Sequence, residues 1–332
     1  MLKVGIIGSG FMGLTHGNAY KQLEDVEIAG FVGAGEANRR KRAQEFNTRE
    51  YPSLDALLDA EDVDIIDICT PSHLNVPMVQ TAAAAGKAIL LEKPVALNLD
   101  EAEQIRDIVH SRGVTLMVAH LLRFWPEYVK ARELVAGGQL GTPRLASAAR
   151  ICQPPDWATW YPDPARSGGV ALVLLVHDID FCNWLFGAPR EVTAAGHQNA
   201  LGAWDDLHIL VRYHSGVSVS FRGSMIMPAG YPFTMQLRVR GDDGGLEYIF
   251  RAGVNLEDPG SAQSEFTLYK DGVPTHPELS TVDGYLGEIS YFVECVRAGR
   301  APELGTIEES TLALRTALAA NESAASGKPV AV

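Results

Sequence analysis

The sequence predicts a two-domain α/β protein, with a parallel sheet in the first domain and an open, mostly antiparallel sheet in an α+β second domain. In residues 2–119, short runs of apolar residues alternate with helical segments, and each run is almost unbroken. Strands buried on both faces have this pattern, because helices cover both sides of a parallel sheet. From Leu145 onward, short β-rich segments separated by turn residues dominate. That second pattern is typical of an antiparallel sheet.

The first half of the chain alternates strand and helix from its start. Predicted strands are 2–7, 26–32, 63–69, 88–91 and 114–119, and predicted helices are 14–23, 36–46, 54–58, 76–85 and a segment that begins at Asn98. Asn98 is followed three residues later by Glu101, which is a capping-box pattern, and Gly113 is suited to end the helix. The sequence therefore predicts both the first and the last residues of this helix.

The second half is predicted to be mostly β-structure with a helical tail. Predicted strands are 145–151, 191–196, 207–213, 217–222, 234–240, 245–250 and 265–269, with one helix at 176–185. Apolar residues recur at helical spacing in 282–296, and a last helix is predicted at 307–323. We place the domains at 1–121 and 122–332 and expect the last helix to pack back on the first domain.

Composition and charge exclude several classes of protein. The chain is 46% hydrophobic, and its net charge of −13 argues against nucleic-acid or anionic-membrane partners, because both need a basic face. The four cysteines lie in apolar stretches without CxxC spacing, which indicates free thiols and no metal site. A strand begins almost at residue 1, and no apolar run reaches the ~18 residues that span a bilayer. We expect a soluble, cytoplasmic protein.

A glycine-rich turn links the first predicted strand to the first helix. Residues 8–13 read Gly-Ser-Gly-Phe-Met-Gly. Gly8 permits a tight turn, Gly10 lets the backbone approach a pyrophosphate, and Gly13 allows close helix–strand packing. An ordinary Gly-rich turn is the alternative. Strand, motif and helix in this order predict a Rossmann-type dinucleotide site. Its residues are Gly8, Gly10, Phe11, Met12 and Gly13.

The end of the second predicted strand bears on the choice of cofactor. A carboxylate that binds the adenosine ribose is expected there, but residues 32–35 read Val-Gly-Ala-Gly, and Glu36 comes too late. Arg39 lies in the basic run that follows, where it can pair with a 2′-phosphate. The alternative is that these cations form the solvated face of a helix. The pattern favours NADP(H) over NAD(H).

A lysine at the end of a later strand is the candidate for chemistry. Glu92, Lys93 and Pro94 follow the apolar run 88–91, which should reach the carboxyl edge of the sheet, where ligands bind. A lysine there can neutralise developing alkoxide charge and carry a proton. Lysines at strand ends are more often solvent anchors, but the proline fixes this one in a turn. We therefore expect Lys93 to be functional.

Several stretches together resemble the Gfo/Idh/MocA oxidoreductases. They are the glycine turn with His16, Thr70-Pro71, Glu92-Lys93-Pro94, His120 to Pro126, Gly138 to Gly141, Ser167-Gly168-Gly169 to Asp180, and Ser323 to Pro329. The resemblance implies a Rossmann domain and a second domain whose open sheet often serves oligomerisation. It also implies hydride transfer between NAD(P) and a hydroxyl-bearing carbon of a sugar, cyclitol or related polyol.

The resemblance further implies roles for individual residues. Lys93 and His177 match the catalytic lysine and histidine. Cofactor contacts are expected from Thr70, Pro71, His73, Glu92 and Lys93, and substrate contacts from His120, Arg123, Trp160, Tyr161, Val173 and His177. Two positions depart from the pattern. Val173 stands where relatives carry a catalytic aspartate, and Asn75 stands where they usually carry a histidine.

Three interpretations of Val173 remain open. The protein acts on a substrate that needs only Lys93 and His177, or it borrows an acid such as Asp178 or Asp180, or it binds dinucleotide and ligand with little turnover. Asp178 is poorly placed for the second role, because adjacent residues of a helix point apart.

Aromatic residues are candidates for the pocket wall, because their faces suit the C–H face of a sugar. They are Trp157, Trp160, Tyr161 and Tyr231, and core packing is the alternative. The function predicted is an NAD(P)-dependent sugar or polyol dehydrogenase or reductase that forms a homo-oligomer, a dimer or tetramer. A weakened dinucleotide-dependent binding or regulatory protein, or an enzyme that cleaves glycosides through transient oxidation, is the alternative.

Overall fold

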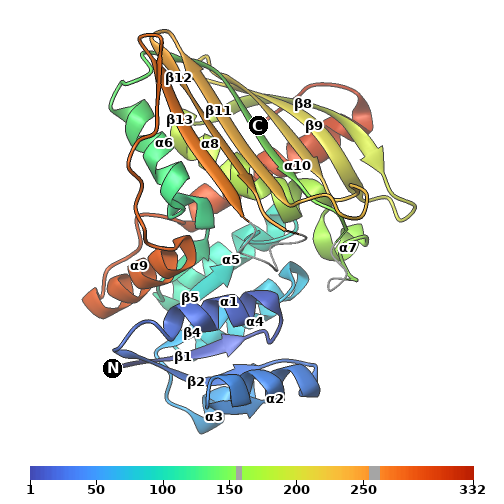
Figure 1. Ribbon diagram of the computed structural model, residues 1–332. Helices are drawn as coiled ribbons and strands as arrows, with labels where there is room; N and C mark the ends of the chain where they lie inside the picture. Colours follow the sequence, from blue (N-terminus) through green and yellow to red (C-terminus); the bar gives the residue numbers. More distant parts are fainter. Residues whose placement is uncertain (155–158, 254–261) are drawn as a thin grey trace. The chain divides into compact units, whose positions relative to one another are not determined.

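The computed structural model describes residues 1–154, 159–253 and 262–332 (Figure 1). The chain divides into two compact units, each described here by itself. The first unit comprises Met1–Trp125 and Val282–Thr311, and the second comprises Pro126–Thr281 and Leu312–Val332. The first unit is therefore assembled from two separate stretches of chain. The last helix, α10 (Ile307–Ser326), is divided between the two units after Thr311.

A six-stranded parallel sheet forms the centre of the first unit, as predicted. Its strand order is β3-β2-β1-β4-β5-β6, so the order reverses between β1 and β4. The strands are β1 (Leu2–Ile7), β2 (Val26–Val32), β3 (Arg49–Tyr51), β4 (Ile65–Ile68), β5 (Ala88–Glu92) and β6 (Leu116–Ala119). Strand β3 was not predicted, because its three residues are too few to show the pattern of apolar and polar residues that indicates a strand. Ligands bind at the carboxyl edge of such sheets, where the order reverses.

Helices cover this sheet, and most lie where the sequence predicts them. They are α1 (Phe11–Tyr20), α2 (Glu36–Glu45), α3 (Leu54–Ala60), α4 (Asn75–Ala84), α5 (Leu99–Arg112) and α9 (Gly284–Ala298), with short 3₁₀ turns η1 (Ser72–Leu74) and η2 (Leu121–Arg123). The capping prediction for α5 is confirmed: the Glu101 N–H donates to Asn98 Oδ1 at 2.9 Å, and Gly113 has φ 63°. Helix α1 begins three residues earlier than predicted, because the glycine turn leads directly into it.

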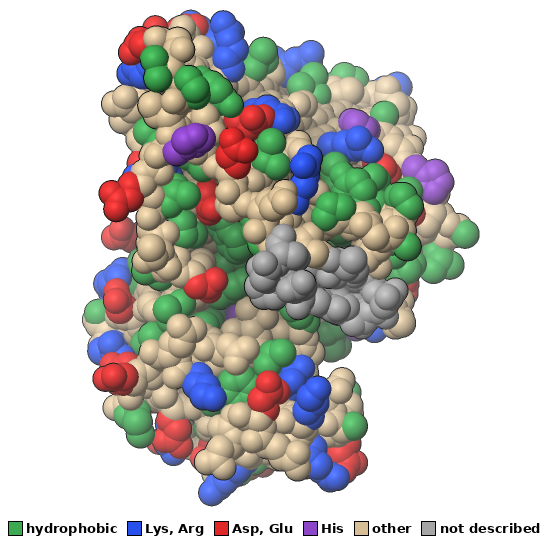
Figure 2. All heavy atoms as spheres, in the orientation of Figure 1, with side chains coloured by type: hydrophobic (Ala, Val, Ile, Leu, Met, Phe, Trp, Pro, Cys, Tyr) green, Lys and Arg blue, Asp and Glu red, His purple; other side chains and the backbone are tan. Residues whose placement is uncertain are grey.

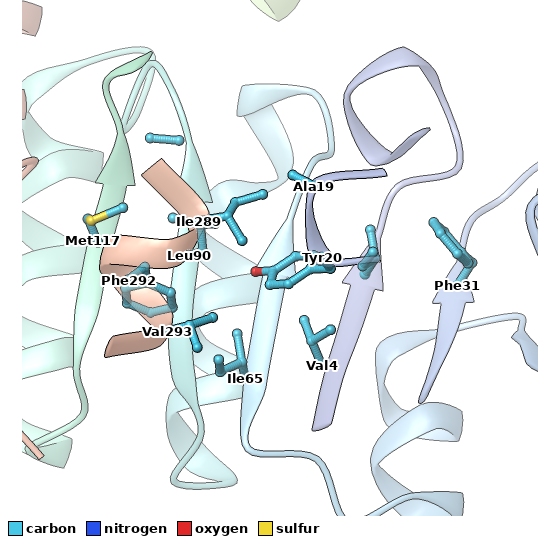
Figure 3. Packing of buried hydrophobic residues seen from close by; sticks show 12 residues of the cluster. Val4, Ala19, Tyr20, Phe31, Ile65, Leu90, Met117, Ile289, Phe292 and Val293 are labelled. Atoms are coloured by element: carbon cyan, nitrogen blue, oxygen red, sulfur yellow. The ribbon is translucent and has the colours of Figure 1, made fainter. Parts of the chain in front are cut away.

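The core of the first unit includes residues from both ends of the chain (Figure 3). Apolar side chains of the sheet, such as Val4, Ile65 and Leu90, pack with Ile289 of α9. Tyr20 is fully buried in the same cluster. Helix α9 is therefore part of the dinucleotide-binding unit, although more than 150 residues separate it in sequence from the rest of that unit.

A nine-stranded sheet forms the second unit, in the order β14-β13-β12-β11-β7-β10-β9-β8-β15. All pairings are antiparallel except β7 with β10, so the predicted mostly antiparallel sheet is confirmed. The strands are β7 (Pro143–Ile151), β8 (Pro189–Gln198), β9 (Trp204–Tyr213), β10 (Ser218–Ser224), β11 (Thr234–Gly241), β12 (Gly244–Arg251), β13 (Gln263–Lys270), β14 (Val273–Thr275) and β15 (Val330–Ala331).

Helices cover one face of this sheet. Figure 1 shows α6 (Pro126–Ala136), α8 (Val176–Phe186) and α10 behind the strands. A short helix, α7 (Pro164–Ser167), and a five-residue π-helical turn, η3 (Ala171–Leu175), precede α8. The span Pro164–Phe186 is long and apolar enough to cross a membrane, but 83% of its most apolar window is buried. It fits a core helix of a soluble protein.

Candidate functional site

The glycine turn has the geometry that its sequence predicts. The Gly8 N–H donates to the Val32 carbonyl at 2.8 Å, and Gly8 has φ 131°, which disfavours any side chain. A Cβ on Gly13 would lie 1.9 Å from the Gly8 carbonyl oxygen, so only glycine fits there. A Cβ on Gly10 would meet no atom within 4 Å. Gly8 and Gly13 are therefore required by the fold, whereas Gly10 leaves open space above the turn.

The residues around this turn fit a bound pyrophosphate and nicotinamide. Helix α1 begins at Phe11, after Gly10 as its N-cap, with no side-chain cap and no acidic residue in its first turn. Phe11 and Met12 therefore start a helix whose dipole favours an anion. Beyond β4, Thr70 Oγ1 and His73 Nδ1 are buried without a hydrogen-bond partner among the described residues. Buried polar atoms are rarely unpaired, so these two atoms suit a ligand.

Arg39 lies in the first turns of α2, close after the end of β2, and its predicted contact with the adenosine ribose stays a prediction. Its Nη1 donates to the Gly33 carbonyl at 3.1 Å, and its Nε lies 3.3 Å from Glu50 Oε2. Arg40, in contrast, is more than half exposed and pairs with Glu36, as expected of a solvated helix face. A 2′-phosphate would therefore compete with Glu50 for the Arg39 guanidinium.

The turn that carries Lys93 is held from both sides. Glu92, the last residue of β5, is buried, and its Oε2 accepts the Lys93 N–H at 2.9 Å. Asn75 Nδ2 donates to the carbonyls of Pro94 at 3.0 Å and Val95 at 3.1 Å. The Asn75 that departs from the family pattern thus fixes the backbone after Lys93. Since β1, β4 and β5 are parallel neighbours, Lys93 shares one edge of the sheet with the glycine turn and the residues after β4.

Buried charged side chains lie behind the Lys93 turn. His16 of α1 contacts Asp67 of β4, with Nδ1 and Oδ2 2.8 Å apart, and its Nε2 lies 3.4 Å from Glu92 Oε1. Burial opposes a charge on His16, but Asp67 and Cys69 raise its pKa well above the usual value. Burial also opposes ionisation of Glu92, yet His16 and Lys93 hold the pKa of Glu92 below its usual range. These groups form an ion-pair network next to Lys93.

Sequence reasoning missed Asp67. The only sequence feature that pointed to Asp67 was its position as an acid inside the apolar run of β4. Burying an unpaired charge there costs free energy of folding. The partner, His16, is 51 residues away in sequence, so the pair was not visible as a local motif.

His120 and Arg123 have partners within the first unit. His120 Nε2 lies 2.9 Å from Ser310 Oγ, and Arg123 Nη1 lies 2.7 Å from Glu309 Oε1. Both side chains are almost completely buried. These contacts attach η2 to the start of α10, and the predicted contact of both residues with substrate stays a prediction.

In the second unit, a glycine pair and a π-helical turn position His177. Gly168 and Gly169 have φ 72° and 82°, and the Val173 N–H donates to the Gly169 carbonyl at 3.0 Å. Val173 is 8% exposed and lies within η3, and His177 is half-buried near the start of α8. π-Helical turns are frequent at functional sites.

Asp178 and Asp180, the two acids that follow His177, are buried within the second unit. Asp178 is fully buried, and its Oδ2 lies 2.8 Å from Arg150 Nε. Asp180 is 1% exposed. Asp178 is therefore engaged by Arg150, which weakens the interpretation in which it replaces the missing aspartate.

Of the predicted aromatic wall, Trp160 and Tyr161 lie against each other. Their ring centroids are 4.2 Å apart in an edge-to-face arrangement, and both residues are half-buried. Tyr231 is also half-buried. Trp157 lies outside the described residues. The contribution of these rings to a pocket stays a prediction.

A Rossmann-type sheet with an open glycine turn defines a dinucleotide-binding protein, and comparison with known proteins identifies which kind. A model of the oxidoreductase family with an NAD-binding Rossmann fold matches residues 2–120, and a model of the C-terminal alpha/beta domain of that family matches residues 132–332. The chain belongs to the Gfo/Idh/MocA oxidoreductase family.

Individual relatives agree with this assignment. The chain is 30% identical over 329 residues to D-xylose 1-dehydrogenase (NADP(+)) 2 of Haloferax volcanii, covering 98% of each chain. It is 29% identical over 339 residues to the uncharacterized oxidoreductase YrbE of Bacillus subtilis, covering 99% and 96%. The structure of GenD2 from gentamicin A biosynthesis, in complex with NAD, matches with TM-score 0.84 at 27% identity, covering 100% of this chain and 96% of that one. The cofactor is therefore a nicotinamide dinucleotide, NAD or NADP.

Proposed function

We propose that this protein is an NAD(P)-dependent dehydrogenase or reductase acting on a carbinol or carbonyl carbon of a sugar, cyclitol or related polyol. One observation carries the proposal. Lys93, in a turn held by Glu92 and Asn75, directly follows β5 at the same sheet edge as the glycine turn. Family membership and the similarity to a xylose dehydrogenase and to inositol 2-dehydrogenases support the substrate class.

The residues divide the work between binding and proton handling. The turn at Gly8, Gly10 and Gly13 and the first turn of α1 bind the pyrophosphate. When bound, the nicotinamide supplies the hydride acceptor or donor. Lys93 stabilises the alkoxide and exchanges a proton with the substrate oxygen, and His177 is the second acid–base group. Glu92 keeps a negative charge beside Lys93, which favours the ammonium form.

Val173 shapes the substrate preference in this proposal. Residues 171–176 are all apolar, so this stretch offers no side chain to bind a vicinal hydroxyl or to orient His177. Common cyclitols and free hexoses are therefore expected to be poor substrates. A substrate with an apolar group, or one that carries its own acid, should fit better.

A cofactor-turnover assay separates the candidate functions. Purified protein is mixed with NAD(H) or NADP(H) and a panel of sugars, cyclitols and acidic polyols, and absorbance of the reduced nicotinamide is followed. A net change supports the dehydrogenase or reductase. Glycoside cleavage without a net change supports transient oxidation with retained cofactor. Saturable binding without either reaction would leave a binding or regulatory protein and reject the proposal.

We also propose that the protein is a cytoplasmic homo-oligomer that associates through the open face of the second sheet. Along β9, Leu207, Ile209 and Val211 are buried, and the alternating residues face outward. Figure 2 shows apolar side chains gathered among charged ones on the surface of the second unit. Leu145 is 54% exposed and Tyr269 is 45% exposed. Light scattering at micromolar concentration tests the proposal, and a monomer would reject it.

A further inference from the structure

Glu50 is an acid of β3 that the proposed reaction does not use. Strand β3 pairs with β2 in parallel register, so Glu50 stands beside Phe31, and Tyr51 stands beside Val32, the last residue of β2. In a Rossmann-type sheet the adenosine ribose binds at the end of the second strand. Glu50 therefore lies close to the expected ribose position, but on the neighbouring strand and not at the end of β2, where an acid is usually found.

The Arg39 side chain connects Glu50 to the end of β2. Arg39 Nη1 donates to the carbonyl of Gly33, the residue that directly follows β2, at 3.1 Å. A Cβ on Gly33 would lie 2.6 Å from Ser9 Oγ, so Gly33 adjoins the glycine turn. The Arg39 guanidinium is therefore fixed between the end of β2 and Glu50. NADP carries a phosphate on the adenosine ribose in this region, whereas NAD carries a hydroxyl.

The contact between Arg39 and Glu50 is incomplete. Arg39 Nε lies 3.3 Å from Glu50 Oε2, yet both atoms are buried and neither has a hydrogen-bond partner among the described residues. The two groups attract each other as charges, without the aligned bonds of a strong guanidinium–carboxylate pair. The other carboxylate oxygen, Glu50 Oε1, lies 3.5 Å from Arg40 Nε. A phosphate with better hydrogen-bond geometry can therefore displace this shared carboxylate from Arg39.

We propose that Glu50 is a specificity-determining residue for the cofactor: its carboxylate competes with the 2′-phosphate of NADP for Arg39, and it pairs with Arg40 alone when the phosphate binds. NAD has no 2′-phosphate and leaves the contact between Arg39 and Glu50 in place. Glu50 therefore lowers the affinity for NADP but not for NAD, and the preference for NADP is smaller than Arg39 alone would produce. This inference rests on the nicotinamide dinucleotide site and not on the proposed substrate.

The Glu50→Gln variant tests this competition, because glutamine keeps the shape of the side chain and removes its charge. Calorimetry measures the dissociation constants of NADP⁺ and NAD⁺ for the whole protein. Glu50→Gln should raise the affinity for NADP⁺ roughly five- to tenfold and leave that for NAD⁺ unchanged. The fragments 2′,5′-ADP and 5′-AMP should show the same difference. Glu45→Gln is the matched control: it removes an acid that pairs with Arg42 at 2.7 Å, and it should change neither affinity.

A double-mutant cycle shows whether Glu50 acts through Arg39. Arg39→Gln should lower the affinity for NADP⁺ about tenfold or more, because the 2′-phosphate loses its charged partner. Adding Glu50→Gln to Arg39→Gln should then raise the affinity for NADP⁺ by no more than about twofold, since no guanidinium remains to compete for. An equal gain in both backgrounds would show that Glu50 acts only as a distant charge, and it would overturn the proposal.

Other results of the binding experiments also decide the question. A loss of NADP⁺ affinity in Glu50→Gln would show that Glu50 holds Arg39 in its binding orientation, and a change of equal size for both cofactors would show a general effect on the site; either result rejects the proposal. If Glu50→Gln does not fold, Arg40→Gln is the second variant, because the Arg40 side chain is 58% exposed.

Arg40→Gln leaves Glu50 to Arg39 alone, so it should lower the affinity for NADP⁺ about threefold and spare that for NAD⁺. An unchanged affinity for NADP⁺ would contradict the sharing of Glu50 between the two arginines. None of these measurements needs turnover, so failure of the proposed reaction leaves the inference standing. Failure of the NADP⁺ measurements, in turn, leaves the proposed dehydrogenase or reductase intact.

Discussion

The two segments proposed to carry the chemistry are built in opposite ways. Behind Lys93 in the first unit lie buried charged side chains, among them His16, Asp67 and Glu92. Around His177 in the second unit, residues 171–176 are apolar without exception. The first unit thus surrounds its candidate residue with buried charged groups, whereas residues 171–176 offer no acid beside the candidate histidine of the second unit.

Each unit contains a buried ion pair, and the two pairs differ in the residues that they contact. Asp178 and Arg150 pair within the second unit, where Asp178 also receives the Tyr128 hydroxyl at 3.4 Å. The His16–Asp67 pair, in contrast, adjoins the Lys93 turn through Glu92. Breaking a buried pair leaves an uncompensated charge and costs about 3–5 kcal/mol. Substitution of one member of either pair should therefore lower the stability of the protein.

The largest expected effect comes from removing the proton carrier of the first unit. Lys93→Ala should lower kcat by roughly two to four orders of magnitude, because a positioned acid–base group and a stabilising charge are both lost. The measurement is turnover on the best substrate found in the panel. Lys87→Ala, which changes the lysine that precedes the opposite end of β5, is the matched control. Full activity of Lys93→Ala would show that the chemistry lies on other residues.

The glycine turn offers a sharper contrast within the first unit. Gly10→Val should weaken dinucleotide binding at least ~100-fold, a cost of about 3 kcal/mol, without lowering Tm, because its Cβ meets no protein atom within 4 Å. Gly13→Ala should instead destabilise the fold by about 1–3 kcal/mol or more, because its Cβ would lie 1.9 Å from Gly8 O. Calorimetric binding and thermal melting distinguish the two effects. Native-like affinity in Gly10→Val contradicts the assignment of the turn.

Introducing an acid at position 173 should reduce the difference between the apolar surroundings of His177 and the charged surroundings of Lys93. Val173→Asp should raise activity on polyols by about tenfold or more, because a carboxylate can bind a hydroxyl and orient His177. It should also cost roughly 1–3 kcal/mol of stability, since position 173 is 8% exposed. Val173→Asn is the uncharged control. Equal kcat/KM for both variants would show that charge at this position is irrelevant.

The smallest expected effect concerns the cofactor. Gly33→Asp should shift preference from NADP(H) toward NAD(H) by roughly five- to tenfold, because like charges repel with about 1 kcal/mol at a partly exposed site. A Cβ at Gly33 would lie 2.6 Å from Ser9 Oγ, so Gly33→Ala is needed to separate this contact from the charge. Dissociation constants for both cofactors are the measurement. A native protein that already binds NAD(H) far more tightly refutes the NADP(H) preference.

Local sequence patterns were sufficient for most of the fold. The glycine turn, the unbroken apolar strands and the Asn98 cap are local signals, and the structure contains all three. The π-helical turn at Ala171–Leu175 was not predicted, because an all-apolar run does not reveal its helical period. Packing of α9 into the first unit was not predicted either, because local periodicity does not encode a long-range partner.

The same limit applies to the candidate site. Lys93 and Gly10 were predicted as site residues because each lies in a short sequence motif with a mechanical reason, and their roles stay predictions. The burial of Glu288 could not be predicted, because an acid within a helix is usually exposed and only the fold shows that this one is buried. Asn75 looked like a departure from a family pattern, and its contact with the Pro94 carbonyl appears only in three dimensions.

The assembly of the first unit from two stretches of chain has a consequence for protein synthesis. A ribosome that adds about 5–20 residues per second completes residues 1–125 on the order of ten seconds or more before residues 282–311 emerge. During that interval the sheet lacks Ile289, Phe292 and Val293, so the nascent domain exposes apolar surface to chaperones and to aggregation. A fragment that ends at Trp125 should therefore be insoluble, whereas a circular permutant that joins 282–311 to 1–125 should fold and bind dinucleotide.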